Sequence, residues 1–254
     1  MTESLSRPNL KKLVFCDIDG CLNEGKNIPL DLEALSEINA LIPELSRRGI
    51  GFTLSTGRPQ PYAEAVAQLL GSRLPFVCEG GAMIYVPERD EYRPLASPGS
   101  LEDVAALRTA ISNSGLLNSE LFFEVGKAYS LCVTGPYLAR RGHDGIRTVM
   151  DDLKQRFVDY PVNWSHSTTS IDITPDGTGK ASGIVAISTE YGVDLTDTLG
   201  IGDSNGDLSM LSTVGQAFCP RNASAEVKQV SHYVSDLEYV HGTLDILNRI
   251  ARQN

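Results

Sequence analysis

Short apolar runs and longer helical patterns alternate along the N-terminal part of the chain. Residues 13–16 form an apolar run, and residues 32–47 repeat apolar side chains at the 3.6-residue spacing of an amphipathic helix. A second run at residues 51–55 precedes a helix that begins at Pro59, and residues 74–78 form a third run. Strands and helices in this order, with short connections, predict a parallel sheet with helices on both faces.

The pattern changes between residues 83 and 179. Strand candidates follow one another closely there, and helical patterns separate the pairs. The stretch around Gly126 is typical of a hairpin connection. This succession predicts a second domain of the α+β class. The candidate strands are residues 83–86, 121–125, 128–133 and 169–174, and the candidate helices are residues 101–112 and 143–157.

After Lys180 the first pattern resumes, with a helix at residues 181–191, a strand at 198–201 and a short helix at 207–212. The simplest interpretation is one α/β domain in two halves that enclose an inserted domain. We therefore predict a doubly wound parallel-sheet core with an inserted α+β domain. The core comprises residues 1–82 and 180–254, and the inserted domain residues 83–179.

The charge of the chain limits its partners. Lys and Arg number 22 against 32 Asp and Glu, which gives a formal net charge of −10. The sequence has no cluster of basic residues, so it lacks the electrostatic footprint of a protein that binds nucleic acid or an anionic membrane. An acidic enzyme with an anionic substrate must concentrate positive charge locally, and a metal ion can supply it.

The cysteines and apolar runs suggest where the protein acts. The five cysteines are scattered and form no CxxC pair, which favours a reducing compartment over a disulfide framework. Residues 1–12 are polar, so we expect no signal peptide, and no apolar run approaches the ~20 residues that span a bilayer. We expect a soluble, cytoplasmic protein that is a monomer or a homodimer.

Two carboxylates, Asp17 and Asp19, follow the first predicted strand. Their spacing places both on the same side of the chain as it leaves the sheet. Ionised carboxylates so close together repel unless a cation or a shared proton lies between them. Asp and Gly also form ordinary turns, so the pair alone leaves a simple turn as an alternative.

A second acidic pair, Asp203 and Asp207, follows the predicted strand at residues 198–201. Ligands of parallel α/β sheets bind beyond the carboxyl ends of the strands, where these side chains are expected. Mg²⁺ prefers one or two carboxylates together with carbonyls, waters and substrate phosphate, and Asp203 is well placed for it. Asp207 could instead be an acidic residue in the first turn of a helix, stabilised by the helix dipole.

Two further segments could bind phosphate. Thr56 offers a hydroxyl and Gly57 a backbone N–H, both at the start of the helix that Pro59 begins, although such a segment is also common in ordinary turns. Lys180 begins a helix, where a cation is disfavoured by ~0.3–1 kcal/mol. A residue that breaks a local rule is a candidate functional residue, and a lysine there could neutralise a phosphate. An ordinary solvated lysine is the alternative.

Taken together, these segments resemble a known family in order and spacing. The resemblance is to the four motifs of haloacid dehalogenase-like phosphatases, and the insertion looks like the cap of their Cof-type, sucrose-phosphatase-like subgroup. It covers nearly the whole chain and implies a Rossmann-like core. The motifs are Asp17-Ile18-Asp19-Gly20-Cys21-Leu22, Ser55-Thr56-Gly57-Arg58, Lys180 and Gly202-Asp203-Ser204-Asn205-Gly206-Asp207.

The resemblance implies a role for each motif. Asp17 would attack phosphorus and also bind Mg²⁺, while Asp19 would act as general acid and base and bind Mg²⁺ through its backbone carbonyl. The phosphoryl oxygens would contact Thr56, Gly57 and Lys180. A further Mg²⁺ ligand would be Asp203, with Asp207 and Asn205 supporting the metal site. This arrangement divides the displacement into two steps through a covalent aspartyl phosphate.

The sequence departs from the family's pattern at three positions. Cys21 stands where the family commonly has Thr, Gly206 where it has Asn, and Gly80 where it has Asn. None of these changes removes a principal catalytic group. The change at Gly206 leaves the surroundings of the metal undetermined, and Asn205 or Ser204 could compensate.

These inferences lead to one main hypothesis and two alternatives. We expect a phosphatase for a small phosphorylated metabolite, either a sugar phosphate or a phospho-carboxylic acid such as phosphoglycolate or a glycosyl-phosphoglycerate. A sugar phosphomutase on the same scaffold is the first alternative, and a non-catalytic protein that binds a phosphorylated ligand is the second. Arg58 could contact the inserted domain, the substrate or solvent. Candidate specificity residues are Lys127, Tyr129, Arg140, Arg141, His143, Trp164 and His166.

Overall fold

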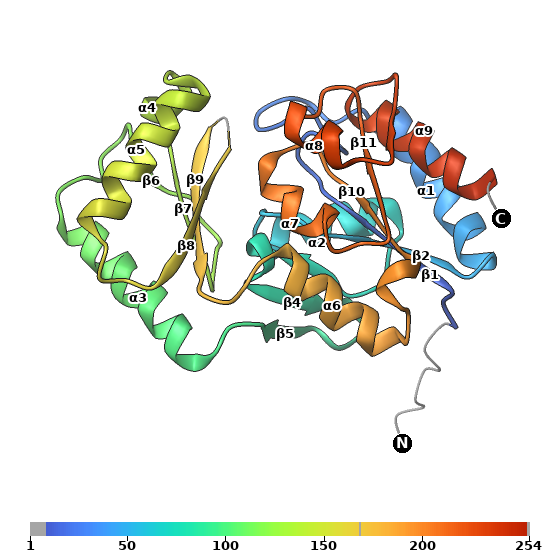
Figure 1. Cartoon of the computed structure of the whole chain (residues 1–254), viewed down its shortest axis with the longest axis horizontal. Coiled ribbons are helices and arrows are strands. Elements are labelled where there is room, and N and C mark those ends of the chain that lie inside the picture. The colour runs from blue at the N-terminus through green and yellow to red at the C-terminus, as the bar shows by residue number, and fades with distance from the viewer. Residues whose placement is uncertain (1–8, 168, 253–254) are drawn as a thin grey trace.

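The computed structural model describes residues 9–252, except residue 168 (Figure 1). Most of the polar N-terminal segment, for which no signal peptide is expected, therefore lies outside the described residues. At the centre is a five-stranded parallel sheet with the strand order β12-β11-β10-β1-β2. Its strands are β1 (Lys12–Cys16), β2 (Ile50–Leu54), β10 (Thr198–Ile201), β11 (Gln216–Cys219) and β12 (Tyr233–Val234).

Helices cover both faces of this sheet, which confirms the predicted doubly wound core. Successive side chains of β1 are apolar and point to opposite faces, so both faces need a cover. Val14 packs on the face covered by α1, α2 and α9, and Phe15 packs on the face covered by α6, α7 and α8. These helices are α1 (Leu32–Arg47), α2 (Gln60–Leu70), α6 (Lys180–Tyr191), α7 (Leu208–Leu211), α8 (Ala225–Val230) and α9 (Tyr239–Arg252).

The strands β3 (Phe76–Cys78), β4 (Met83–Val86) and β5 (Glu91–Pro94) form a three-stranded antiparallel sheet beside the core. β3 continues the parallel sheet through a bridge between Val77 and Ser55. The side chains of β4 alternate between the two core clusters, with Tyr85 in one and Ile84 in the other. The sequence analysis assigned β4 and β5 to the inserted domain, but they pack with the core. We therefore propose a boundary near residue 95 in place of residue 83.

The inserted domain is built on a four-stranded antiparallel sheet in the order β6-β7-β9-β8. Helices α3 and α5 cover the face of this sheet that is turned away from the core (Figure 1), and the predicted α+β class is confirmed. Its strands are β6 (Phe122–Phe123), β7 (Leu131–Thr134), β8 (Val162–His166) and β9 (Ser170–Pro175), and its helices are α3 (Pro98–Asn113), α4 (Pro136–Ala139) and α5 (Gly142–Arg156).

Side chains along β9 alternate between the two faces of this sheet. Ile171 and Ile173 pack against the helices, so Asp172 between them faces the opposite way, toward the core. The inserted domain thus presents the polar side of its sheet to the core. Short 3₁₀ turns complete the chain at η1 (Glu79–Gly81), η2 (Pro87–Arg89), η3 (Leu195–Asp197) and η4 (Asn205–Asp207).

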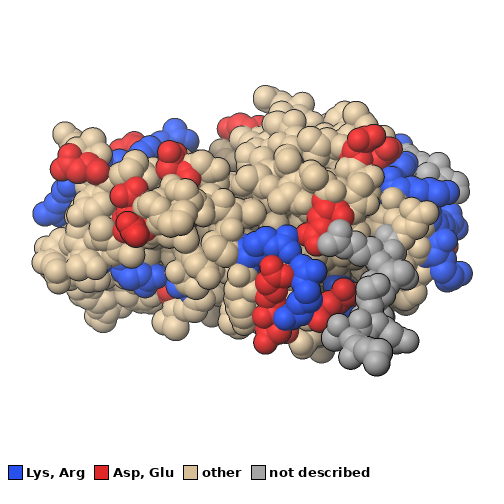
Figure 2. All heavy atoms as spheres, turned by 90° about the horizontal axis from the view of Figure 1, so that it is seen from below, with Lys and Arg blue, Asp and Glu red and all other residues tan. Residues whose placement is uncertain are grey.

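Charged side chains on the face seen in Figure 2 form small groups in which acidic and basic residues are mixed. Arg93, for example, lies 2.8 Å from Glu190 and 3.3 Å from Glu91. Within residues 9–252, residue 168 apart, no helix is both long and apolar enough to cross a membrane.

Candidate active site

The two central strands of the parallel sheet carry the acidic motifs. Asp17 follows β1, Asp203 follows its neighbour β10, and the backbone N–H of Asp17 donates to the carbonyl of Ile201, 2.9 Å away. The chain leaves β1 toward β2 on one side, while β10 and β11 lie on the other. Such a reversal of strand order opens a crevice at the carboxyl ends of the strands, which is where ligands bind in α/β sheets.

Three carboxylates meet in this crevice. Asp17, Asp203 and Asp207 each offer an oxygen within 4.8 Å of the others, and we call these residues the acidic cluster. Asp17 Oδ1 is buried and contacts the ammonium of Lys180 without forming a hydrogen bond. Asp203 Oδ1 is buried and has no hydrogen-bond partner among the described residues. Buried oxygens of this kind are rare unless they bind water or an ion.

Burial and mutual repulsion change how the acidic cluster ionises. Burial raises the pKa of Asp17 to about 7, repulsion from Asp207 adds to the rise, and Lys180 opposes it. Burial raises the pKa of Asp203 to about 8, again with repulsion from Asp207 and Asp17. The cluster therefore holds more negative charge than its single lysine neutralises. A cation bound there would stabilise the ionised carboxylates.

Lys180 lies at the start of α6, as predicted, and is buried beside two carboxylates. Its Nζ is 3.1 Å from Asp17 Oδ1 and 2.5 Å from Asp207 Oδ1. Burial alone would lower the pKa of Lys180, but Asp17 and Asp207 raise it above the ordinary value. The lysine is charged, and its unfavourable position in the helix is offset by the two ion pairs.

Asp207 uses both of its carboxylate oxygens within the protein. While Oδ1 pairs with Lys180, Oδ2 accepts hydrogen bonds from the backbone N–H groups of Asp203 and Ser204 at 3.1 and 3.0 Å. The neighbouring Asn205 is exposed, and its Oδ1 accepts a hydrogen bond from the hydroxyl of Ser224 at 3.0 Å. Asp207 thus fixes the loop that carries Asp203.

Gly20 allows Asp203 to approach the loop after β1. It has a φ of +78°, and a Cβ added to it would lie 2.0 Å from Asp203 Oδ2. The carbonyl of Gly20 accepts a hydrogen bond from Asn222 Nδ2 at 2.9 Å, a contact that the sequence analysis did not predict. Cys21, which replaces the family's usual Thr, is buried in a core cluster.

Thr56 and Gly57 follow the end of β2, in the same crevice. Thr56 is fully buried, and its Oγ1 accepts the backbone N–H of Arg58 at 3.1 Å. Among the described residues, the hydroxyl proton of Thr56 has no acceptor and the N–H of Gly57 has none. A phosphate site formed by Thr56 and Gly57 stays a prediction from the sequence.

Arg58 holds the carboxylate of Asp19 in two parallel hydrogen bonds of 2.6 Å each. This fork geometry fixes the orientation of a carboxylate closely. The guanidinium also lies 4.7 Å from the ring centre of Tyr62 and 3.9 Å from Glu124 in the inserted domain. Of the three roles left open for Arg58 by its sequence, contact with the inserted domain is the one observed.

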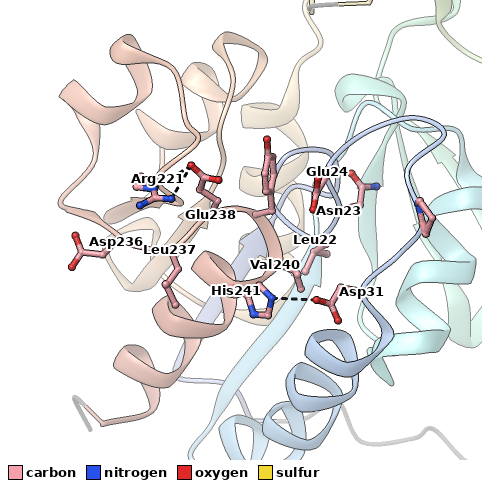
Figure 3. A pocket seen from close by; sticks show the side chains of 12 residues that line it. Leu22, Asn23, Glu24, Asp31, Arg221, Asp236, Leu237, Glu238, Val240 and His241 are labelled. Carbon is pink, nitrogen blue, oxygen red and sulfur yellow. Dashed lines mark hydrogen bonds and ion pairs between the residues drawn. The ribbon is translucent and has the colours of Figure 1, made fainter.

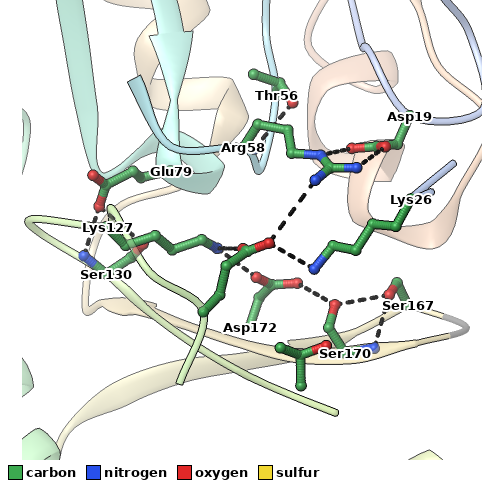
Figure 4. Close-up of polar contacts among 12 residues, drawn as sticks. Asp19, Lys26, Thr56, Arg58, Glu79, Lys127, Ser130, Ser167, Ser170 and Asp172 are labelled. Carbon is green, nitrogen blue, oxygen red and sulfur yellow. Dashed lines mark hydrogen bonds and ion pairs between the residues drawn. The ribbon is translucent and has the colours of Figure 1, made fainter. Parts of the chain in front are cut away.

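Charged side chains from the two domains meet around Asp19 and Arg58 (Figure 4). We call Lys26, Arg58, Glu124, Lys127 and Asp172 the inter-domain network. Lys26 lies 2.6 Å from Glu124, and Lys127 lies 2.7 Å from Asp172 and 3.8 Å from Glu124. Burial would lower the pKa of Lys127, but Asp172 raises it above the ordinary value, and Lys127 in turn lowers that of Asp172.

Glu79 ties the core to the loop between β6 and β7. Its buried carboxylate accepts the backbone N–H groups of Ala128, Tyr129 and Ser130, each at 2.8 Å, and the Ser130 hydroxyl at 3.0 Å. This loop carries Lys127, so Glu79 helps to position the inter-domain network. The sequence analysis assigned no role to Glu79.

The other candidate specificity residues occupy varied positions. Arg140 pairs with Glu120, Arg141 stacks on Tyr137 at 4.1 Å, and both arginines are exposed. Only the backbone of His143 is described. Tyr129 packs against a core cluster, Trp164 packs in the core of the inserted domain, and His166 Nδ1 lies 3.2 Å from the carbonyl of Ser167. Lys127 is the candidate whose charged group joins the inter-domain network.

A separate surface pocket of about 480 Å³ lies beside the loop after β1 (Figure 3). Leu22 and Asn23 line it on one side, and residues 236–241 line it on the other. An ion pair between His241 and Asp31 crosses its wall at 3.1 Å. No member of the acidic cluster lines this pocket, so it is distinct from the candidate active site.

Comparison with known proteins places the fold and the motifs in context. A family described as haloacid dehalogenase-like hydrolase matches residues 14–132 and 134–247 of the chain. A phosphoglycolate phosphatase from Methanopyrus kandleri is 25% identical over 251 residues, which cover 96% of this chain and 99% of that relative. A second phosphoglycolate phosphatase, from Methanospirillum hungatei, is also 25% identical, and the match covers 92% of this chain and 94% of that relative.

Solved structures share the fold at lower identity. The sucrose-phosphatase of Synechocystis, in complex with sucrose and phosphate, superposes with a TM-score of 0.70 at 18% identity and covers 94% of this chain and 98% of its own. Thermoplasma acidophilum 0175 superposes with a TM-score of 0.72 at 20% identity, with the same coverage of 94% and 98%. These likenesses establish a Rossmann-like α/β core with an inserted α+β domain.

Proposed function

This chain belongs to the haloacid dehalogenase-like hydrolase family, and we propose that it is a Mg²⁺-dependent phosphatase for a small phosphorylated metabolite. The observation that carries the proposal is the buried acidic cluster, with Lys180 beside Asp17 at the carboxyl end of the central strand. Relatives named as phosphatases, which match over nearly their whole length, support the same class of reaction.

The donor atoms of the acidic cluster fit a hard divalent cation. Mg²⁺ favours oxygen ligands, and the cluster offers a buried oxygen of Asp17 that pairs with Lys180 and a buried oxygen of Asp203 that accepts no hydrogen bond from the described residues. We propose that these two carboxylates and the backbone carbonyl of Asp19 hold the metal. Bound there, Mg²⁺ would neutralise charge on the phosphoryl group and keep both carboxylates ionised at neutral pH.

Asp17 is the proposed nucleophile. One of its carboxylate oxygens forms a bond to phosphorus as the bond between phosphorus and the leaving oxygen breaks. The product is an aspartyl phosphate, which water then hydrolyses. Lys180, 3.1 Å from Asp17 Oδ1, is close enough to attract the phosphoryl group to this carboxylate and to offset its charge.

Asp19 is the proposed general acid and base. It gives its proton to the departing alkoxide in the first step and takes a proton from the attacking water in the second. Both carboxylate oxygens of Asp19 accept hydrogen bonds from Arg58 in this structure, which fixes where the carboxylate points, and at least one of these bonds must open before Asp19 can carry a proton. Arg58 is thus proposed as a positioning residue that acts through Asp19.

The remaining motif residues bind the phosphoryl group or support the loops. We propose that the hydroxyl of Thr56 and the N–H of Gly57 donate to phosphoryl oxygens, together with Lys180. Asp207 would act on the metal indirectly, because both of its oxygens already bind Lys180 and the loop of Asp203. Asn205, bonded to Ser224, would stabilise the same loop from its exposed side.

A direct experiment follows from this mechanism. Purified protein should release inorganic phosphate from members of a panel of sugar phosphates and phospho-carboxylic acids when Mg²⁺ is present, and should release none when Mg²⁺ is chelated. Hexose 1-phosphates in the panel separate hydrolysis from mutase activity, which would yield a 6-phosphate without free phosphate. Tight binding of a panel member without any turnover would contradict the proposed function.

A further inference from the structure

Glu124 lies at the point where the charges of the two domains converge. Its backbone N–H donates to the carbonyl of Cys132 at 2.8 Å, which fixes it beside β7. Its carboxylate lies 2.6 Å from Lys26, 3.8 Å from Lys127 and 3.9 Å from Arg58. Figure 4 shows the side chains of Lys26 and Arg58, from the core, and of Lys127, from the inserted domain, pointing toward the same place.

Each of these three cations already has an anionic partner close by. Arg58 forms two hydrogen bonds with Asp19, Lys127 pairs with Asp172, and Lys26 pairs with Glu124. Without Glu124 the three cations would face only two carboxylates. When Asp19 is counted with the inter-domain network, the three cations face three carboxylates, and Glu124 supplies the negative charge that makes this group of side chains electrically neutral.

This neutral group of side chains includes Asp19, the residue that would protonate the leaving group. Whatever part of the substrate departs with that proton must contact the surroundings of Asp19 and Arg58. A carboxylate on this part of the substrate would meet Glu124 as a like charge and would find no unpaired cation in the inter-domain network. A hydroxyl would meet carboxylates, ammonium groups and serine hydroxyls that can all form hydrogen bonds with it.

We propose that Glu124 is a specificity-determining residue that selects an uncharged, hydroxylated leaving group and rejects one that carries a carboxylate. The discrimination acts through charge, because Glu124 compensates cations that would otherwise attract a carboxylate, and it would itself meet that carboxylate as a like charge. This inference rests on the proposed phosphatase activity and narrows its substrate class. The inference concerns the leaving group of the substrate, and the proposed reaction of Asp17 with the phosphoryl group does not depend on it.

The test compares two substrates that differ only in this group. Phosphoglycolate carries a carboxylate where 2-hydroxyethyl phosphate carries a CH₂OH group, and 3-phosphoglycerate and glycerol 3-phosphate form a second such pair. For the wild type we expect kcat/KM to favour the hydroxylated member of each pair by about tenfold or more. In Glu124→Gln, which keeps the shape and removes the charge, the ratio should fall by about tenfold, chiefly through a lower KM for the carboxylate.

A second variant should shift the same ratio in the opposite direction. Lys26→Met leaves Glu124 with less compensating charge, so discrimination against the carboxylate should increase. Glu120→Gln serves as the control, because Glu120 is an exposed acid of the inserted domain that pairs with Arg140. The control should leave the ratio unchanged. If Glu124 and Lys26 merely held the two domains together, Glu124→Gln and Lys26→Met would each lower kcat/KM equally for both substrates of a pair.

Each result supports or overturns the inference. Opposite shifts of the ratio in Glu124→Gln and Lys26→Met support it. The inference is overturned if both variants lose kcat/KM equally on the two substrates, if the ratio of the two kcat/KM values does not change, or if the wild type prefers the carboxylates. None of these results would contradict the phosphatase activity. If the wild type releases phosphate from none of the four compounds and none from p-nitrophenyl phosphate, the proposed function itself fails, and the inference fails with it.

Discussion

The acidic cluster and the inter-domain network contain the same kinds of side chain in opposite balance. In the acidic cluster, three carboxylates share one lysine, and a buried carboxylate oxygen of Asp203 accepts no hydrogen bond from the described residues. In the inter-domain network, by contrast, Glu124 matches Lys26 and Asp172 matches Lys127, while Asp19 beside the network matches Arg58.

The pKa values follow this difference. Burial raises the pKa of Asp17 and Asp203 because too little positive charge lies nearby. Asp172 is half-buried, and although desolvation alone would raise its pKa, Lys127 lowers it below the ordinary value. Charge that a protein leaves uncompensated in its interior marks a place where a ligand completes the structure. We therefore expect the acidic cluster to bind a cation, whereas the charges of the inter-domain network already compensate one another.

Replacing the proposed nucleophile should have the largest effect. Asp17→Asn removes the attacking carboxylate and a metal ligand, so kcat for phosphate release should fall by on the order of 10³-fold or more. The matched control is Asp176→Asn, which changes an exposed acid in the turn after β9 and should leave kcat unchanged. Phosphate release under saturating Mg²⁺ measures both. Retained turnover in Asp17→Asn would exclude the covalent mechanism.

The next largest effect should come from Lys180→Met, which leaves the three carboxylates without their cation. Activity should fall by roughly 10²-fold because one donor to the phosphoryl group is lost. Breaking a buried ion pair also costs about 3–5 kcal/mol of unfolding free energy, and bound Mg²⁺ should restore part of it. Urea denaturation with and without Mg²⁺ measures this, with the exposed Lys228→Met as the control. A stability loss that Mg²⁺ does not reduce would argue against a metal site beside Lys180.

The metal-free protein should lose stability as the pH rises. The pKa values of Asp17 and Asp203, about 7 and about 8 in the folded state, lie above the ordinary value of 3.8. Between about pH 4 and pH 8 the folded protein therefore holds protons that the unfolded chain has released. The unfolding free energy falls with rising pH, by up to about 1.4 kcal/mol per pH unit for each group.

Saturating Mg²⁺ should remove this slope, because it favours the ionised carboxylates of the folded state. The double variant Asp17→Asn, Asp203→Asn should remove it without Mg²⁺, since neither amide titrates. Chemical denaturation across this pH range measures each case. A metal-free protein whose stability rises from pH 5 to pH 8 would contradict the uncompensated charge of the acidic cluster.

Loss of the tether between the domains should have the smallest effect. Glu79→Gln removes the charge that binds three N–H groups and a hydroxyl, so unfolding free energy should fall by about 1–3 kcal/mol. The loop that carries Lys127 should become less well placed, which should raise KM a few-fold and change kcat little. Glu91→Gln, at a half-exposed position in β5, is the control. A fall in kcat as large as that of Lys180→Met would assign Glu79 to the chemistry instead.

The sequence predicted those helices and strands whose position is set by a local pattern of apolar residues or by a capping residue. The core strands are continuous apolar runs because both faces of a parallel sheet are buried, and α1 has the predicted bounds because Asp31 caps it and its apolar spacing is regular. β5 and β8 were missed because Glu91–Pro94 and Val162–His166 are largely polar and lie at the edges of their sheets.

The same limit applies to the site. The residues of the acidic cluster could be anticipated because parallel strands end at one edge of the sheet. The partners across the domain boundary could not, because nothing in the sequence pairs Lys26 with Glu124 or Glu79 with residues 128–130. Such contacts depend on how the two domains pack together. The sequence around a charged residue on a helix or loop does not indicate which residue of the other domain it contacts.

The most direct test of the difference between the two regions is calorimetric titration of Mg²⁺ into the wild type, Asp203→Asn and Asp172→Asn. The two variants make the same change, one in the acidic cluster and one in the inter-domain network. Asp203→Asn should weaken Mg²⁺ binding by at least about tenfold, and Asp172→Asn should leave the affinity within about twofold of the wild type. Equal Mg²⁺ affinities in all three proteins would contradict the assignment of the acidic cluster as the metal site.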